Sequence, residues 1–296
     1  QKTAYEISLG LVGSEMCIRD REKFKVALAQ MECSVGDKEA NLTKMEEMAK
    51  EAKKRGAELV IYPELATTGY LCRDLFYELA EPVPGPTTER MAQLAREEGL
   101  YLVFGMPEKS TISSSILYNT AVLVGPEGLV GSYRKLYLPT HSVFEEKRYF
   151  RPGYKVGVYD TALCRIGMMV CYDAFFPEVA RLLKLRGAQL IVCISASPGV
   201  RRFYFETFLT ARALENTVHL AYVNLAGRED GLQFWGGSRL IGPTGSLIAK
   251  AKYDEEDLVI GEVDLHDAER AGVFLPMLRD LRPEVIEWMT EATSSY

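Results

Sequence analysis

Short apolar segments alternate with longer amphipathic ones along most of the chain. Residues 24–30, 57–62 and 100–105 are short runs rich in apolar side chains, and this pattern predicts buried strands. In residues 37–55 the apolar positions recur at a helical spacing, and residues 86–98 are also predicted to be helical. Strands that alternate with helices in this way are typical of layered α/β proteins.

Three other regions have the pattern of a β-hairpin, in which two strands are separated by a short turn. They are residues 117–135, with Pro-Glu-Gly at the turn, residues 156–173, and residues 238–251, with Pro-Thr-Gly at the turn. Hairpins exclude a purely parallel sheet. We therefore expect an α/β fold in which two mixed β-sheets pack face to face with helices outside, an α-β-β-α sandwich. The remaining predicted elements are helices over residues 175–186 and 202–216 and strands over residues 189–194, 218–224 and 258–264.

The domain organisation follows from what interrupts these patterns. No internal repeat, low-complexity tract or linker rich in proline, glycine or serine divides the chain, so residues 23–296 are predicted to form a single domain. Residues 1–22 have neither a helical nor a strand period, and they lack the long apolar stretch of a signal peptide. Residues 1–21 resemble translated sequencing-adapter read-through. We interpret residues 1–22 as a non-native or disordered N-terminal extension.

Composition excludes several classes of protein. A chain of 296 residues with 47% hydrophobic and 26% charged residues is neither disordered nor fibrous. The sequence contains no uninterrupted apolar run of about 18 residues, so no membrane span is predicted. A net charge of -6 argues against a nucleic-acid partner. Six scattered cysteines without a CxxC and three distant histidines predict neither a disulfide framework nor a metal site, and they favour a cytoplasmic protein with reduced thiols.

Candidate chemistry gathers where the predicted strands end. Glu64 directly follows an apolar strand, Lys135 ends a hairpin strand, and Cys171 ends the strand IGMMVC. A cysteine in such a position is usually inert. Cys171, however, precedes a helix predicted from about Phe175, whose positive end favours a thiolate. The backbone N–H of Tyr172 is then placed to stabilise an oxyanion.

A general base is also needed, and no histidine lies near any nucleophile in the sequence. Glu64 stands between an apolar strand and the uncharged stretch LATTGY. A carboxylate in a dry pocket exchanges protons near neutral pH, because burial raises its pKa. Lys135 is suited to neutralise charge and to donate a hydrogen bond to a developing oxyanion.

Several ordered segments resemble the carbon–nitrogen hydrolase superfamily, also called the nitrilase superfamily. They are YPELATTGY, YRKLYLP, EEKRYFRPG, CYDAFFPE, RALEN and GGSRLIGPTG, and the resemblance covers residues 24–283. It implies an α-β-β-α fold and a catalytic triad of Glu64, Lys135 and Cys171. It also implies a supporting glutamate at Glu146, with Glu145 as the neighbouring alternative. The implied reaction passes through a thioester and requires no metal or organic cofactor.

The resemblance also implies an assembly and a class of substrate. Members commonly pair through the helices predicted over residues 175–186 and 202–216 and through the C-terminal tail, so we expect a homodimer or larger homo-oligomer. Small amides or nitriles are the expected substrates. An amidase for small aliphatic amides or ω-amides is favoured, with a nitrilase or an N-carbamoyl amine amidohydrolase as alternatives. A catalytically silent binding protein and a metal hydrolase are alternatives from other classes. The predicted substrate-binding residues are Tyr70, Phe144, Phe175, Ser195 and Ser197.

Overall fold

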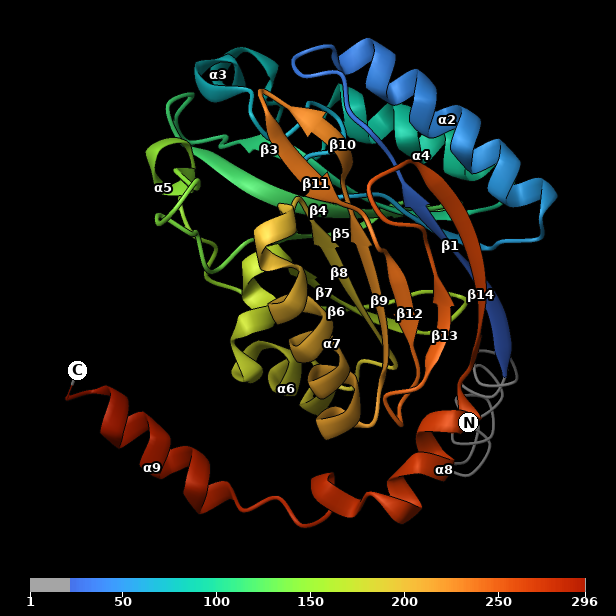
Figure 1. Cartoon of the computed structure of the whole chain (residues 1–296), viewed down its shortest axis with the longest axis vertical. Coiled ribbons are helices and arrows are strands. Elements are labelled where there is room, and N and C mark those ends of the chain that lie inside the picture. The colour runs from blue at the N-terminus through green and yellow to red at the C-terminus, as the bar shows by residue number, and fades with distance from the viewer. Residues whose placement is uncertain (1–21, 296) are drawn as a thin grey trace, which may run out of the picture.

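The computed structural model describes residues 22–295. Two mixed six-stranded sheets pack against each other, and helices cover their outer faces (Figure 1). The predicted α-β-β-α sandwich is therefore confirmed. The predicted N-terminal extension, residues 1–22, lies outside the described residues except for Glu22.

The first sheet has the strand order β14-β1-β2-β3-β4-β5. Strands β1, β2 and β3 are parallel, whereas β14, β4 and β5 join by antiparallel pairing. These directions place the C-terminal ends of β2 and β5 at the same edge of the sheet. The strands are β1 (Lys23–Gln30), β2 (Leu59–Ile61), β3 (Tyr101–Lys109), β4 (Leu117–Gly125), β5 (Gly128–Arg134) and β14 (Asp257–Asp264).

The second sheet has the strand order β13-β12-β9-β8-β7-β6. Strands β7, β8 and β9 are parallel, and the outer strands pair antiparallel. The C-terminal ends of β7 and β8 therefore also lie at one edge. The strands are β6 (Val158–Asp160), β7 (Arg165–Val170), β8 (Leu190–Ser195), β9 (His219–Asn224), β12 (Arg239–Ile241) and β13 (Leu247–Lys250).

Side chains on strand β1 show how the layers are joined, because successive residues of a strand point to opposite faces of the sheet. Val26 and Leu28 belong to the core between the two sheets. Ala27 and Ala29 belong to a second core, beneath the helices of the first sheet. The outer helices are α2 (Lys38–Lys54) and α4 (Pro86–Glu98) on the first sheet, and α6 (Pro177–Leu185) and α7 (Arg202–Asn216) on the second.

Local signals explain where two of these helices begin and end. The side chain of Asp37 accepts a hydrogen bond of 3.0 Å from the backbone N–H of Ala40, which caps the start of α2. Pro86 is the first residue of α4, a position where its missing N–H costs nothing. Gly99, in the left-handed region with a φ of 61°, ends α4. The predicted helices over residues 37–55 and 86–98 are confirmed.

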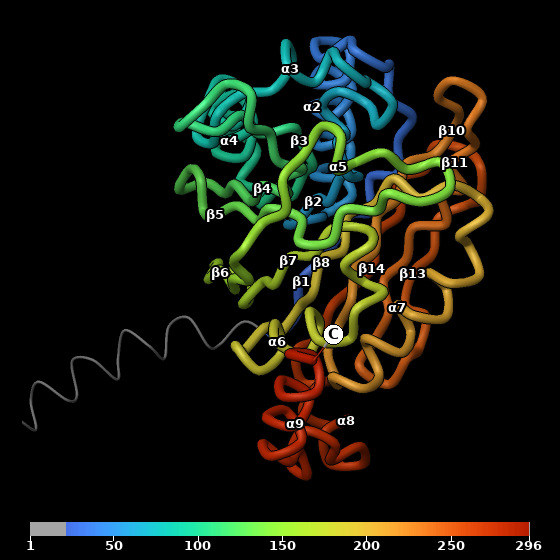
Figure 2. The backbone as a smooth tube through the Cα atoms, turned by 90° about the vertical axis from the view of Figure 1, so that its left-hand side faces the viewer, coloured from blue at the N-terminus to red at the C-terminus, as the bar shows by residue number. Residues whose placement is uncertain are grey.

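Several elements were not predicted from the pattern of apolar residues. A separate hairpin, β10 with β11, and the short helices α3 and α5 lie near the edge where β2, β5, β7 and β8 end. Helices α8 and α9 lie beyond one end of the sandwich (Figure 1, Figure 2). No helix among residues 22–295 is long and apolar enough to cross a membrane. The additional elements are α3 (Phe76–Leu79), α5 (Glu146–Tyr149), β10 (Ala226–Glu229), β11 (Leu232–Trp235), α8 (His266–Phe274) and α9 (Pro283–Thr293).

Candidate active site

Lys135 forms the centre of a buried charged cluster at the edge where the strands end. Its Nζ donates hydrogen bonds of 2.7 Å to Oε1 of Glu64 and of 2.7 Å to Oε1 of Glu146. The side chains of Lys135 and Glu64 are 0% exposed, and that of Glu146 is 4% exposed. Two carboxylates therefore share one ammonium group away from water.

Glu64 has two further partners that fix its carboxylate. Asn119 Nδ2 donates a 2.7 Å hydrogen bond to Oε1, and the backbone N–H of Ala196 donates one of 2.7 Å to Oε2. Asn119 was not among the site residues predicted from the sequence. An amide side chain in the middle of the apolar strand LYNTAVLVG is the signal that would have indicated it, because a buried amide requires a partner.

A glycine allows the backbone at Glu64 to pack against strand β3. A Cβ atom on Gly105 would lie 2.3 Å from the backbone nitrogen of Leu65 and 2.7 Å from the Cα of Glu64. Any side chain at this position would therefore displace Glu64. Leu65 itself has a φ of 51°, in the left-handed region that non-glycine residues rarely adopt.

Cys171 lies immediately after strand β7 and begins a 3-10 turn, Cys171–Phe175. It is buried, and its φ of 48° is also in the left-handed region. Arg212 of α7 holds the outer side of this turn. Its Nε donates a 3.0 Å hydrogen bond to the carbonyl of Ala174, and its Nη2 donates one of 3.2 Å to the carbonyl of Phe175.

Asp173 connects the cysteine turn to the segment that carries Lys135. Its Oδ2 accepts hydrogen bonds of 2.8 Å from the hydroxyl of Tyr133 and of 3.0 Å from the N–H of Val170. Its Oδ1 accepts one of 2.9 Å from the N–H of Tyr137. Tyr133 and Tyr137 lie two residues on either side of Lys135, so Asp173 brings the two sheets' contributions together. Sequence reasoning missed this residue.

A second connection joins the cysteine turn to Glu64. Strands β7 and β8 are parallel neighbours in which Val170 is opposite Ile194. Cys171 therefore emerges beside Ser195, and the next residue, Ala196, donates its N–H to Glu64. The structure thus brings Glu64, Lys135, Glu146 and Cys171 into one site.

Burial opposes the thiolate character that the helix position predicts for Cys171. Burial raises the pKa of the Cys171 thiol well above its usual value, and the charge of Glu64 raises it further. The charge of Lys135 opposes these effects without overcoming them. Desolvation therefore acts against the effect expected from the helix end. A neutral resting thiol needs a proton acceptor, and the carboxylate of Glu64 is part of the same site.

The charges of the cluster are strongly coupled. Burial lowers the pKa of Lys135, but Glu146 and Glu64 together raise it well above its usual value, so Lys135 is a cation. Burial raises the pKa of Glu146 to about 7, although the charge of Lys135 lowers it. Glu146 also accepts a 2.7 Å hydrogen bond from the hydroxyl of Tyr70. The adjacent Glu145 is exposed, so the glutamate that contacts Lys135 is Glu146.

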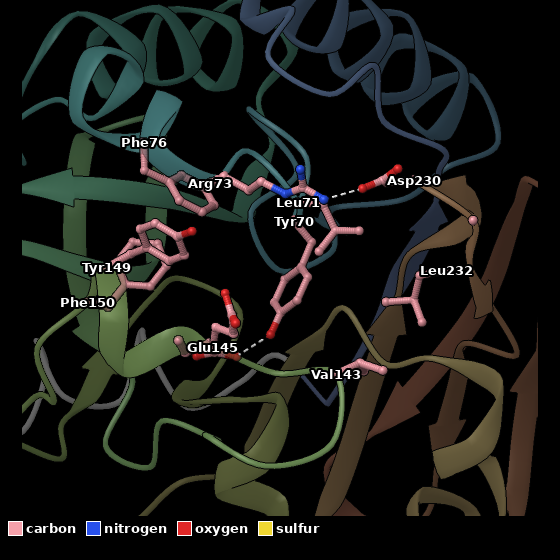
Figure 3. Close-up of a pocket in the computed structure, with 12 residues that line it drawn as sticks. Tyr70, Leu71, Arg73, Phe76, Val143, Glu145, Tyr149, Phe150, Asp230 and Leu232 are labelled. Carbon is pink, nitrogen blue, oxygen red and sulfur yellow. Dashed lines mark hydrogen bonds and ion pairs between the residues drawn. The ribbon is translucent and has the colours of Figure 1, made fainter.

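One cavity lies beside Cys171 and another borders Glu146. The small one, of about 10 Å³, is next to Cys171 and Tyr172, and the predicted substrate residues Phe144 and Phe175 line it. The larger one, of about 630 Å³, is bordered by Glu146 and Tyr70. Figure 3 shows the larger cavity, in which Arg73 and Asp230 are paired on one side and Phe76 and Tyr149 lie on the other.

The other predicted substrate residues are fully buried. The Oγ atom of Ser197 has no hydrogen-bond partner within the described part of the chain. The hydroxyl of Ser195 lies beside the Cys171 thiol and the Tyr222 hydroxyl, and hydrogen bonding to it opposes the rise in the pKa of both groups. The N–H of Ser197 donates a 2.7 Å hydrogen bond to Oδ1 of Asn224. Among residues 22–295, no group of three or more histidine, cysteine, aspartate or glutamate side chains is arranged to hold a metal ion.

Comparison with solved structures finds the same architecture in an amidase. A mutant of the amidase from Nesterenkonia sp. AN1 has a TM-score of 0.78 and 29% sequence identity, and the match covers 91% of this chain and 97% of that one. That structure shows covalent addition of the acetamide moiety of fluoroacetamide at the active site cysteine of the amidase.

Comparison with characterised sequences places the chain in a family. The family described as carbon-nitrogen hydrolase matches residues 25–272. A nitrilase from Pyrococcus abyssi is 39% identical over 248 residues, covering 82% of this chain and 90% of the relative. Omega-amidase NIT2 from Xenopus tropicalis is 35% identical over 272 residues, covering 89% and 96%. The chain therefore belongs to the carbon-nitrogen hydrolase family and is a hydrolase of carbon–nitrogen bonds other than peptide bonds.

Proposed function

We propose that the chain is a cysteine-dependent amidase that releases ammonia from small aliphatic amides or ω-amides. The observation that carries this proposal is the position of Lys135, which binds both Glu64 and Glu146 at 2.7 Å beside the Cys171 turn. Glu64, Lys135 and Cys171 are the proposed catalytic residues, and Glu146 is the supporting carboxylate. The names of the relatives, an amidase and an omega-amidase among them, support the choice of an amide.

In the first half of the proposed reaction, Glu64 takes the thiol proton while Sγ of Cys171 bonds to the amide carbonyl carbon. Lys135 and the backbone N–H of Tyr172 stabilise the negative oxygen that results. The carbon–nitrogen bond then breaks, Glu64 passes its proton to the nitrogen, and ammonia leaves a thioester behind. Water next adds to the thioester carbon and gives a proton to Glu64. The carbon–sulfur bond breaks, the proton returns to the thiol, and the carboxylic acid departs.

The predicted substrate residues fit this scheme in three groups. Phe144 and Phe175 line the cavity beside Cys171, which supports a role in holding the acyl chain. The buried Oγ atom of Ser197 lacks a partner in the described structure and is suited to accept a hydrogen bond from the substrate NH2 group, and the hydroxyl of Ser195 lies beside the Cys171 thiol, where it can reach the same NH2 group. Tyr70 borders the site from the side of Glu146 and orients that carboxylate through its hydroxyl.

An ammonia-release assay over a panel of amides, nitriles and N-carbamoyl amines tests the proposal. We expect short amides to be hydrolysed and the Cys171→Ala variant to release no ammonia. Fluoroacetamide should add the mass of one acetamide moiety to a Glu64→Gln variant, in which hydrolysis of the amide is blocked, and none when Cys171→Ala is added, as measured by intact-mass spectrometry. Ammonia release by Cys171→Ala at a tenth of the wild-type rate would show that Cys171 is not the nucleophile.

A nitrilase is the second candidate, because the Pyrococcus abyssi relative with 39% identity carries that name. A nitrile would form a thioimidate with Cys171 and would then need one more water molecule before ammonia leaves. The same panel separates the two functions. Ammonia release from nitriles but not from the corresponding amides would replace the amidase proposal.

We further propose that residues 23–296 act as one domain and assemble as a homodimer or larger homo-oligomer. Apolar side chains of α6, α7, α8 and α9 are exposed on the described monomer, and large exposed apolar patches mark association surfaces. Light scattering at micromolar concentration should give a mass of at least two chains, and a monomer mass would contradict the assembly. The exposed apolar residues of these four helices are Leu185, Phe203, Val273, Phe274, Ile286 and Trp288.

The five described cysteines are unpaired, which supports a cytoplasmic location.

A further inference from the structure

The small cavity beside Cys171 contains one strong cation, Arg201. The guanidinium carbon of Arg201 lies 5.8 Å from the centre of the Phe144 ring, and the side chain is half-buried. No carboxylate within residues 22–295 forms an ion pair with it. The other walls of this cavity include Phe175 and Phe205, which offer a cation no counter-charge. Arg201 is therefore a positive charge next to the nucleophile with an unused capacity for hydrogen bonding.

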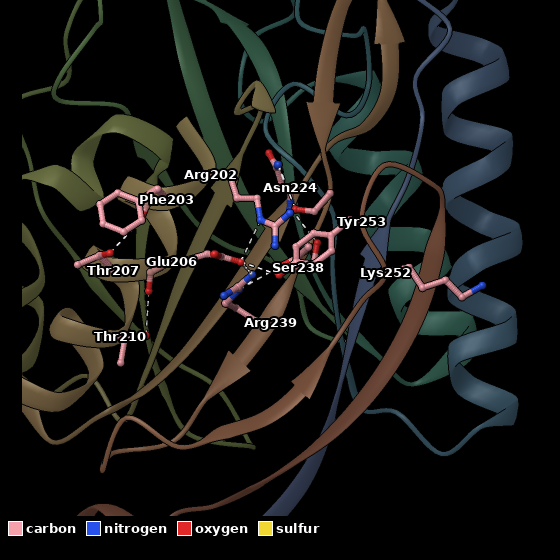
Figure 4. A network of polar contacts seen from close by, with 12 residues as sticks. Arg202, Phe203, Glu206, Thr207, Thr210, Asn224, Ser238, Arg239, Lys252 and Tyr253 are labelled. Atoms are coloured by element: carbon pink, nitrogen blue, oxygen red, sulfur yellow. Dashed lines mark hydrogen bonds and ion pairs between the residues drawn. The ribbon is translucent and has the colours of Figure 1, made fainter. Parts of the chain in front are cut away.

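The neighbouring residue, Arg202, differs from Arg201 because its guanidinium group has an acidic and an aromatic partner within the protein. Its Nε is 3.4 Å from Oε1 of Glu206, and its guanidinium carbon lies 3.5 Å from the centre of the Tyr253 ring. Glu206 also accepts hydrogen bonds from Arg239 and from the hydroxyl of Tyr253 (Figure 4). The charge of Arg202 is thus satisfied within a network, unlike that of Arg201.

The chain segment that carries Arg201 also reaches the proposed catalytic residues. It leaves strand β8 at Ser195, and Ala196 donates its N–H to Glu64. The segment then forms the turn Gly199–Arg201, whose last residue lines the small cavity. One short segment therefore links the carboxylate that handles the proton to a cation in the cavity beside the nucleophile.

We propose that Arg201 is a specificity-determining residue that binds a carboxylate at the far end of the substrate. The preferred substrates are then ω-amides of short dicarboxylic acids rather than neutral amides, an inference that rests on the proposed amidase function. A guanidinium group matches a carboxylate in shape and donates two parallel hydrogen bonds to it. The aromatic walls strengthen this pairing, because they keep water from part of the site.

Charge within the site favours the same orientation of the substrate. Glu64, Glu146 and Lys135 together carry an excess of one negative charge when both glutamates are ionised. A substrate carboxylate is repelled from that side and attracted to Arg201, so the amide end is left facing Cys171. The present cavity of about 10 Å³ holds no more than about one water molecule. The half-buried side chains of Arg201 and Phe175 must therefore turn outward when a substrate enters.

Two substrates of similar length test the role of Arg201. Succinamate has an amide at one end and a carboxylate at the other, whereas butyramide has a methyl group in place of the carboxylate. We expect wild-type kcat/KM to favour succinamate at least tenfold. Arg201→Gln should lower this preference by roughly 10- to 100-fold, which corresponds to losing a charge-assisted hydrogen bond, and the loss should fall mainly on KM. Arg202→Gln is the matched control and should leave the preference unchanged. Arg201→Glu should favour 4-aminobutyramide over succinamate.

Binding supplies a measurement that does not depend on turnover. Succinate should raise the melting temperature of the Cys171→Ala protein, and the added change Arg201→Gln should remove that rise. If the ratio of kcat/KM for succinamate to that for butyramide were the same in wild type and Arg201→Gln, the role of Arg201 would be overturned. The amidase proposal would remain intact. A fall in oligomer mass on Arg201→Gln, with an unchanged preference, would instead make it an interface residue and also overturn the inference. Failure to hydrolyse any amide would refute the proposed function itself.

Discussion

Replacing Lys135 with methionine removes the one cation from the buried charged cluster while keeping much of the side-chain volume. Glu64 and Glu146 would then be two carboxylates without a counter-charge, and both are almost completely buried. Removing one partner of a buried ion pair typically costs about 3–5 kcal/mol. The total free energy of unfolding of a domain is commonly about 5–15 kcal/mol. We therefore expect Lys135→Met to lose a large fraction of the stability at about pH 8.

The loss of unfolding free energy in Lys135→Met should be larger at high pH than at low pH. Burial already raises the pKa of Glu146 to about 7 in the wild-type chain, so the folded state holds its proton more tightly than the unfolded chain does. Such a group destabilises the fold as pH rises from the unfolded pKa towards the folded one. Without Lys135, the pKa of Glu146 should rise further, because the charge of Lys135 lowers it in the wild-type chain. The deficit of Lys135→Met should therefore shrink on acidification from about pH 8 to 5.5, by roughly 1.4 kcal/mol per pH unit over the range in which Glu146 is protonated in the folded variant but ionised in the folded wild type.

Urea unfolding followed by tryptophan fluorescence measures the loss of stability and its dependence on pH, because Trp235 is buried in the core. Lys54→Met at the exposed end of α2 is the control, and it should change the free energy of unfolding by less than about 0.5 kcal/mol. Adding Glu146→Gln to Lys135→Met removes one uncompensated carboxylate and should restore part of the stability. Equal midpoints for wild type and Lys135→Met at both pH values would refute the buried cluster.

Three further predictions concern the chemistry of the site. Iodoacetamide should modify Cys171 far faster than the other described cysteines although its thiol is neutral at rest, because Glu64 can take the thiol proton as the new carbon–sulfur bond forms, and peptide mapping after brief labelling checks this. Glu146→Gln should lower kcat for amides by about 100-fold, since misplacement of the reacting groups alone costs that much, whereas the exposed Glu145→Gln should do little. An effect of Glu145→Gln with a silent Glu146→Gln would contradict the contact to Lys135. Asp173→Asn should lower kcat at least tenfold, because an amide nitrogen cannot accept from Val170, and a wild-type rate would show that Asp173 does not align the two sheets.

The sequence predicted those parts of the fold in which local signals and tertiary packing agree. The predicted helix over residues 202–216 coincides with α7, and the first predicted hairpin coincides with β4 and β5 to within a residue. The hairpin formed by β10 and β11 was missed because its ten residues include two glycines, three charged residues and few adjacent apolar side chains. Its stability comes from packing against the site loops rather than from a local pattern.

The candidate site was predictable in its residue types but not in its connections. Each of Glu64, Lys135 and Cys171 ends a recognisable strand, which indicates a common edge. That Asp173 joins the two sheets depends on a contact over 40 residues of sequence, to Tyr133, which no local pattern reports. The difference between Arg201 and Arg202 is also invisible in a sequence. Two adjacent arginines look equivalent until Glu206 and Tyr253 are placed beside one of them.

The left-handed backbone at Cys171 has a consequence for the evolution and engineering of this chain. A residue with a Cβ atom at a φ of 48° is destabilised by about 1–2 kcal/mol, whereas glycine adopts that conformation freely. A glycine in place of Cys171 would therefore relax the fold while removing the reactive thiol. Selection for heat resistance alone would favour loss of the nucleophile, so a screen for more robust variants has to retain a test of turnover. The retention of a cysteine in this conformation is what selection for catalysis, rather than for stability, would produce.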